Sequence, residues 1–297
     1  MTFIMDIIKG MLIGIANVIP GVSGGTMAVS MGIYDKLIHS ITHLFKEFKN
    51  SVCTLFPILL GCGLGIVGFS YLIQFLLDKH TFVTCMTFVG LILGGLPVLI
   101  ASLRASAKKS NARFSPVYVI AFLALFALAV GLPMLGTGDE VTKVLTPTPA
   151  NMLILLIIGV VASATMVVPG VSGSLVLMIL GYYDSILGLV TDFLDALKAM
   201  DMEALKTTVL LLMPFGVGVI LGIFLIAKLI EFLFNRYSVA TYSAILGLIV
   251  ASPFAIFYNT GLFAALPGLN IWAILFGVLL CVAGAVITYF LGEKKSE

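Results

Sequence analysis

A short glycine-rich motif that occurs twice most constrains how this chain can fold. The first copy, Pro-Gly-Val-Ser-Gly-Gly-Thr, spans residues 20–26, and the second, Pro-Gly-Val-Ser-Gly-Ser-Leu, spans residues 169–175. Both copies lie within long apolar sequence, although proline cannot extend a helix and glycine weakens one. We therefore expect each copy to interrupt a helix. Interrupted backbone inside a bilayer must be buried in protein or line a water-filled cavity.

The composition places the chain in a membrane. Its 297 residues are 61% hydrophobic and 10% charged, whereas a soluble domain carries about 25% charged residues. Apolar segments near the ~20 residues that span a bilayer recur along the sequence. We expect an all-α polytopic membrane protein that lacks a signal peptide and has no nucleic-acid partner. Four scattered cysteines indicate buried thiols and no metal cluster: Cys53, Cys62, Cys85 and Cys281.

The two halves of the sequence resemble each other. At an offset of 149 residues, Pro20 aligns with Pro169, and Gly-Ile-Tyr-Asp at 32–35 aligns with Gly-Tyr-Tyr-Asp at 181–184. At an offset of 157 residues, a proline and three glycines align with their counterparts: Pro57, Gly61, Gly65 and Gly90 with Pro214, Gly218, Gly222 and Gly247. Ordered matches of this kind indicate an internal repeat. We expect two homologous halves, 1–140 and 141–297.

Charge and segment length predict how the repeats cross the membrane. Apolar segments lie at about 3–33, 52–77, 82–101 and 116–135, and again at about 151–183, 208–234, 239–257 and 271–291. The limbs beside each motif hold about 12–17 apolar residues, fewer than a full span, so each motif segment is expected to be a re-entrant hairpin. A hairpin of two complete crossings has the same parity, and limb length alone favours the re-entrant form.

With such hairpins, the basic residues of 34–51, 102–115, 235–238 and the C-terminus fall on one side, which the positive-inside rule assigns to the cytoplasm. Each half is then a re-entrant helical hairpin plus three transmembrane helices. The first hairpin enters from the cytoplasm and the second from outside, and both chain termini are cytoplasmic. Inverted repeats with broken helices near the midplane are typical of alternating-access transporters.

The motifs carry the residues from which we predict an anion site. Ser23 and Ser172 are candidate N-caps of short helices that restart after each Pro-Gly, and a helix N-terminus presents free N–H groups to an anion. The predicted substrate-binding residues are Asn17, Pro20, Gly21, Ser23, Gly24, Gly25, Thr26, Thr165, Gly170, Ser172, Gly173 and Ser174. Two other interpretations stay open: glycines that only allow close helix packing, or a cation site of carbonyls and hydroxyls.

Four ionisable residues are candidates for coupling or substrate entry. Asp35 and Asp184 follow Gly-x-Tyr in each half, and Glu231 lies at the end of an apolar segment. Arg104 is the residue nearest a membrane segment among the basic residues of 102–115. Intramembrane carboxylates are usually functional, so proton or sodium coupling is conceivable, although surface or capping roles account for the same residues. His39 and His43 have the spacing of a helical metal chelate, but we interpret them as a solvated face and expect no metal.

No catalytic constellation is recognisable, so we expect no enzyme and no cofactor. A transporter or channel for a small anion, and a membrane enzyme or assembly factor, are the alternatives that the residues leave open. The doubled motif, the Gly-x-Tyr-Asp that follows each copy and the length resemble the bacterial polyprenyl-phosphate transporter family. This resemblance covers nearly the whole chain. The second copy departs from the first with Ser174 in place of Gly25 and Leu175 in place of Thr26.

The resemblance implies a function and a location. The expected activity is the return of undecaprenyl phosphate, the lipid carrier of cell-wall and surface-polysaccharide synthesis, from the outer to the inner leaflet of the bacterial cytoplasmic membrane. The expected partners are this anionic lipid and the bilayer, while the oligomeric state is left open. No lysine or arginine lies in either motif, so the resemblance assigns no basic phosphate ligand.

Overall fold

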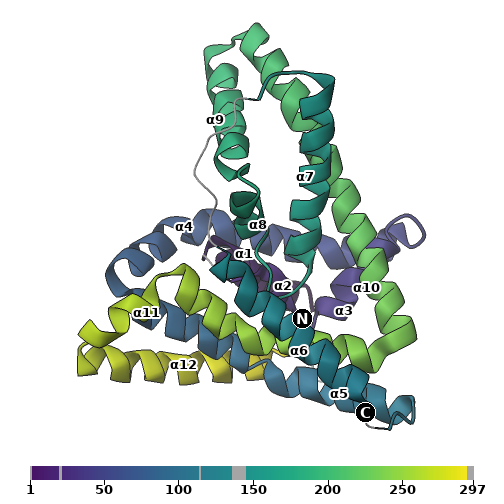
Figure 1. Ribbon diagram of the computed structural model, residues 1–297, viewed down its shortest axis with the longest axis vertical. Helices are drawn as coiled ribbons and strands as arrows, with labels where there is room; N and C mark the ends of the chain where they lie inside the picture. The colour runs from purple at the N-terminus through teal and green to yellow at the C-terminus, as the bar shows by residue number, and fades with distance from the viewer. Residues whose placement is uncertain (1, 20–21, 114, 136–144, 293–297) are drawn as a thin grey trace. The chain divides into compact units, whose positions relative to one another are not determined.

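The computed structural model describes residues 2–19, 22–113, 115–135 and 145–292, and within these ranges the chain is helical and contains no strand (Figure 1). The elements are α1 (Thr2–Val18), α2 (Gly24–Ser30), α3 (Tyr34–Thr42), α4 (Phe48–Leu93), α5 (Leu96–Lys109), α6 (Pro116–Met134), α7 (Pro149–Val167), α8 (Gly173–Ile179), α9 (Tyr183–Ala199), α10 (Met202–Asn259), α11 (Leu262–Ala265), η1 (Leu266–Gly268) and α12 (Ile271–Leu291). The predicted all-α class is confirmed.

Several helices have the length and composition of membrane spans. Among the described residues there are five such segments: Phe48–Lys109, Pro116–Met134, Pro149–Val167, Met202–Asn259 and Ile271–Leu291. Their outward faces carry large apolar side chains, which only a lipid environment accommodates in such number. The structure is therefore that of a polytopic membrane protein.

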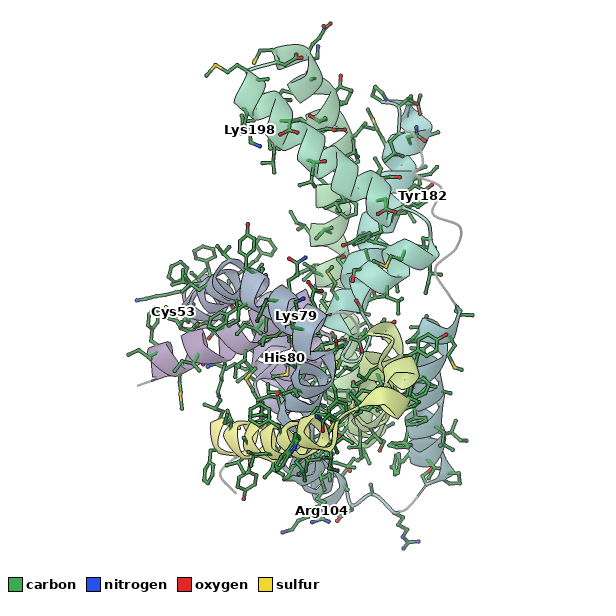
Figure 2. All side chains as sticks on the ribbon, turned by 90° about the vertical axis from the view of Figure 1, so that its left-hand side faces the viewer. Cys53, Lys79, His80, Arg104, Tyr182 and Lys198 are labelled. Carbon is green, nitrogen blue, oxygen red and sulfur yellow. The ribbon has the colours of Figure 1, made fainter. Side chains whose placement is uncertain are left out.

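The two longest helices each contain one break in helical geometry. In α4 the break is at His80 (φ −137°, ψ 43°), which Figure 2 labels at the bend, and in α10 it is at Tyr237 (φ −133°, ψ 45°). The sequence predicts turns between apolar segments at 78–81 and 235–238, and the breaks fall inside both. Their separation equals the repeat offset of 157 residues.

Both motifs interrupt helices, as the sequence predicts. The helices that restart after them, α2 and α8, are each 7 residues long. Each then ends at a glycine in the left-handed region, Gly32 with φ 70° and Gly181 with φ 72°. A residue with a side chain is strained there, so this conformation explains why Gly-x-Tyr-Asp recurs after both motifs. The chain turns at this glycine and then begins α3 in the first case and α9 in the second. The axes of α8 and α9 meet at a bend of 110°.

The chain forms two compact units. Unit 1 comprises 1–134, 168–171 and 227–297, and unit 2 comprises 135–167 and 172–226. In unit 1, α4 packs against α1 and α12 (Figure 1). In unit 2, α8 packs against α7 and α9 around a core that includes Leu155, Ile158 and Leu211.

Glycines bring helices into backbone contact at equivalent positions in the two units. In unit 1, a Cβ on Gly61 would lie 2.1 Å from the carbonyl oxygen of Ile7 on α1. In unit 2, a Cβ on Gly218 would lie 2.1 Å from the carbonyl oxygen of Leu156 on α7. The two contacts are related by the same offsets that align the sequence halves. Close packing through small residues is a general way in which membrane helices associate.

Two further glycine contacts cross between the halves of the sequence, both within unit 1. Gly90 of α4 meets the backbone of Cys281 on α12, where a Cβ would lie 2.0 Å from the carbonyl oxygen. Gly247 of α10 meets the backbone of Phe122 on α6, where a Cβ would lie 2.2 Å from the carbonyl oxygen. The last helix of each half thus packs against a long helix of the other half.

Replacing Gly61 with alanine is expected to destabilise the protein by about 1–3 kcal/mol, because the added carbon collides with backbone that no side-chain rotation can move. Gly63→Ala in the same helix is the matched control, since nothing lies within 4 Å of its position. Thermal unfolding in detergent measures both. Equal Tm values for the two variants would contradict the contact, and Gly218→Ala against Gly216→Ala repeats the comparison in unit 2.

Candidate functional site

The first motif places a buried hydroxyl group, which no other described residue contacts by a hydrogen bond, at the start of α2. Ser23 has the extended backbone of an N-cap (φ −105°, ψ 135°), but its side chain does not cap the helix. The residue is 5% exposed, and its Oγ has no hydrogen-bond partner among the described residues. An unpaired buried polar group costs roughly 1–3 kcal/mol. A hydroxyl kept in this state is available to a ligand.

Asn17 performs the capping role that the sequence suggests for Ser23. Its Oδ1, at the end of α1, accepts a hydrogen bond of 3.0 Å from the backbone N–H of Gly24. A Cβ on Gly24 would lie 2.6 Å from the Asn17 amide, which explains the glycine at this position. One free N–H of α2 is thus satisfied from the preceding helix, and the Ser23 hydroxyl stays free.

Thr26 joins the two motifs within unit 1. Its Oγ1 accepts a hydrogen bond of 2.7 Å from the backbone N–H of Gly170, and its side chain is fully buried. Gly170 has φ 78°, and a Cβ there would lie 3.1 Å from Leu248 of α10. The turn of the second motif is therefore held between Thr26 and α10, and only glycine fits it.

The second motif continues into unit 2, where its serines pair with each other. Ser172 is the N-cap of α8 in extended conformation (φ −94°, ψ 123°), again without a side-chain cap. Its Oγ lies 2.8 Å from the Oγ of Ser174. Gly173 packs against the carbonyl oxygen of Ala162, 2.8 Å from the position of a Cβ, and Thr165 donates to that same oxygen at 2.7 Å.

The other predicted site residues are dispersed. Pro20 and Gly21 lie outside the described residues, and Gly25 is half-buried in the first turn of α2. Asp184 is exposed on α9. The remaining three candidates, Asp35, Glu231 and Arg104, line two separate hollows of unit 1.

Asp35 and Glu231 share one polar cavity of about 540 Å³. The hydroxyl of Tyr242 on α10 donates to Asp35 Oδ2 at 2.6 Å, and Glu231 Oε1 lies 3.3 Å from His43 Nδ1. The cavity is also lined by His39, Ser106, Lys109, Asn235, Arg236 and Ser238. From the sequence, Arg236 was assigned to topology and Lys109 to topology and anionic headgroups, and neither was placed in a site. Tyr242 was overlooked, although a hydroxyl inside an apolar segment was the available signal.

The histidines next to this cavity stack on each other. The rings of His39 and His43 lie 4.2 Å apart at an interplanar angle of 6°, and with Glu231 they offer three donor atoms within 4.8 Å of one another. This spread exceeds the roughly 3 Å between ligands that metal–nitrogen bonds of ~2 Å allow, so the side chains would have to move to share one ion. The expectation of no metal stays a prediction.

A buried charge group on α1 also escaped sequence reasoning. Lys9 is 2% exposed and Asp6 is 6% exposed. Asp6 pairs with Lys36 of α3 at 3.2 Å. Buried charges require partners, and this pairing ties α3 to α1.

Comparison with known proteins gives consistent results. The family described as VCA0040-like, undecaprenyl phosphate translocase-like, matches residues 13–265. The chain is 29% identical over 297 residues to a polyprenyl-phosphate transporter of Staphylococcus aureus, covering 99% of this chain and 97% of that protein. It is 31% identical over 268 residues to a polyprenyl-phosphate transporter of Vibrio cholerae, covering 85% of this chain and 77% of that protein. No solved structure matches the chain.

Replacing Thr26 with valine is expected to destabilise the protein by about 1–3 kcal/mol, since it keeps the shape but leaves the part-buried Gly170 N–H without its acceptor. Thr26→Ser should retain most of the stability because it keeps the oxygen. Thr165→Val is the matched control, because that hydroxyl bonds only to its own helix. Thermal unfolding in detergent distinguishes these outcomes, and a Thr26→Val protein as stable as Thr165→Val would refute the assigned contact.

Proposed function

Because the chain belongs to the undecaprenyl phosphate translocase-like family, we propose that it carries polyprenyl phosphate from the outer to the inner leaflet of a bacterial cytoplasmic membrane. The relatives in S. aureus and V. cholerae bear the name polyprenyl-phosphate transporter. The transported lipid is the undecaprenyl phosphate of cell-wall and surface-polysaccharide synthesis. The protein acts as a transporter and not as an enzyme.

The phosphate binds at the two motifs. The observation that carries this assignment is the buried Ser23 hydroxyl, which has no hydrogen-bond partner in the part of the chain that the structure describes and can donate to a phosphate oxygen. Backbone N–H groups at the starts of α2 and α8 supply further donors, and helix N-termini favour anions. At the second motif, Ser172 and Ser174 exchange their mutual hydrogen bond for bonds to the phosphate. The isoprenoid tail stays in the lipid throughout.

Alternating access requires two inverted halves, and we assign them to 1–140 and 141–297, each a re-entrant hairpin plus three transmembrane helices. Three observations support equivalent halves: the helix breaks at His80 and Tyr237, the left-handed glycines 32 and 181, and the paired contacts of Gly61 and Gly218. At 1.5 Å per residue, the 7-residue helices α2 and α8 are about 10 Å long, which supports re-entrance. Both termini face the cytoplasm in this arrangement.

Leaflet-resolved transport of undecaprenyl phosphate in proteoliposomes tests the function. Wild-type protein is expected to equilibrate the lipid between leaflets. Ser23→Ala and Ser172→Ala should each slow transport about tenfold or more, because each variant loses one hydrogen bond to a charged group. Ser70→Ala is the control, because this half-buried serine lies outside both motifs and donates to the Ile66 carbonyl oxygen of its own helix. Absence of transport by the wild type would refute the function, and unaffected rates in both serine variants would refute the site.

Coupling to an ion gradient is assigned to Asp35, because it shares the polar cavity with Glu231 and is held by Tyr242. Asp35→Asn is expected to abolish the response of transport to an imposed proton or sodium gradient. Equilibration of the lipid in the absence of a gradient should stay unchanged. Asp184→Asn, at an exposed position, is the matched comparison. A gradient response that survives in Asp35→Asn would exclude this carboxylate as the coupling group.

A further inference from the structure

A groove in unit 1 combines an apolar lining with two arginines. It measures about 390 Å³ and lies between α5, α6 and α10. Its lining residues are Leu103, Arg104, Ala107, Ala112, Arg113, Tyr118, Val119, Phe122, Val239, Ser243 and Leu246. None of them belongs to the two motifs or to the cavity of Asp35.

The groove lies beside a close contact between α6 and α10. At Gly247 and Phe122 the backbones of α10 and α6 are in contact. The other lining residues of these helices, Tyr118 and Val119 on α6 and Val239 and Ser243 on α10, all precede that contact in the sequence. The groove therefore lies on one side of the helix contact, and Phe122 is among its lining residues.

The charges of the groove are all positive. Arg104, in α5, and Arg113, in the segment after it, are both exposed, and Figure 2 shows the Arg104 side chain extending away from the ribbon. Neither arginine has an acidic partner among the described residues, and no carboxylate lines the groove. An arginine without a protein anion is a ready ligand for phosphate, which it binds with two parallel hydrogen bonds.

We propose that this groove docks the substrate lipid before or after transport, with its phosphate between Arg104 and Arg113 and the first isoprene units along Tyr118 and Phe122. This inference rests on the proposed function and adds a second binding position to it. A phosphomonoester carries a charge of about −1.5 to −2 at pH 7, which matches two arginines better than the single charge of a phosphodiester headgroup. A single groove also suits a lipid with one chain, whereas a glycerophospholipid has two.

Site-resolved crosslinking of the full-length protein tests the proposal. A photoreactive polyprenyl monophosphate is incorporated into nanodiscs, and crosslinked peptides are mapped by mass spectrometry. Labelling is expected within 103–122 and 239–246. The double variant Arg104→Gln/Arg113→Gln should lower labelling of these segments about tenfold or more, since each lost arginine removes charge-assisted hydrogen bonds. Arg236 is an exposed arginine of the separate cavity, and Arg236→Gln should leave the labelling of these segments unchanged.

Competition identifies the occupant. Excess unlabelled polyprenyl monophosphate should remove the labelling, whereas phosphatidylglycerol and inorganic phosphate at the same concentration should not. Equal competition by phosphatidylglycerol would overturn the proposal in favour of a general anionic-lipid surface, and unchanged labelling in the double variant would overturn it outright. Wild-type protein that transports the lipid without labelling the groove refutes only this inference, while protein that neither transports nor becomes labelled refutes the function as well.

Discussion

Backbone groups that lose their helical partners inside a membrane must find others, and this requirement governs the structure around the motifs. At the first motif, the side chain of Asn17 accepts a hydrogen bond from the N–H of Gly24, and that of Thr26 accepts one from the N–H of Gly170. Hydrocarbon offers no hydrogen bonds, so each of these side chains does what water does in a soluble protein. The exception is the hydroxyl of Ser23, which is buried and has no partner among the described residues.

The same requirement explains why the two motifs differ in sequence. Thr26 supplies the oxygen that holds the turn of the second motif, and its counterpart Leu175 cannot supply one. In the second copy, Ser174 replaces a glycine and pairs with Ser172 instead. The first copy thus holds the turn of the second copy through the hydrogen bond between Thr26 and Gly170. The two copies of the motif therefore have different roles in the structure.

Local features of the fold could be predicted from the sequence, whereas distant contacts could not. Proline and glycine act on their own backbone, so the helix breaks, the N-cap positions of Ser23 and Ser172 and the turns near His80 and Tyr237 follow from nearby residues. The bonds of Thr26 to Gly170 and of Tyr242 to Asp35 join residues 144 and 207 positions apart. No local pattern indicates such pairs, because they depend on which helices become neighbours. The sequence also suggested Ser23 as the capping side chain. The structure shows that Asn17 of α1 accepts the hydrogen bond from the N–H of Gly24 instead.

The glycine contacts at Gly90 and Gly247 have a consequence for how the protein is made. Because α12 packs on α4 and α6 packs on α10, the first half of the chain cannot complete its own helix packing when it leaves the ribosome. It must wait in the bilayer until the final helix is inserted.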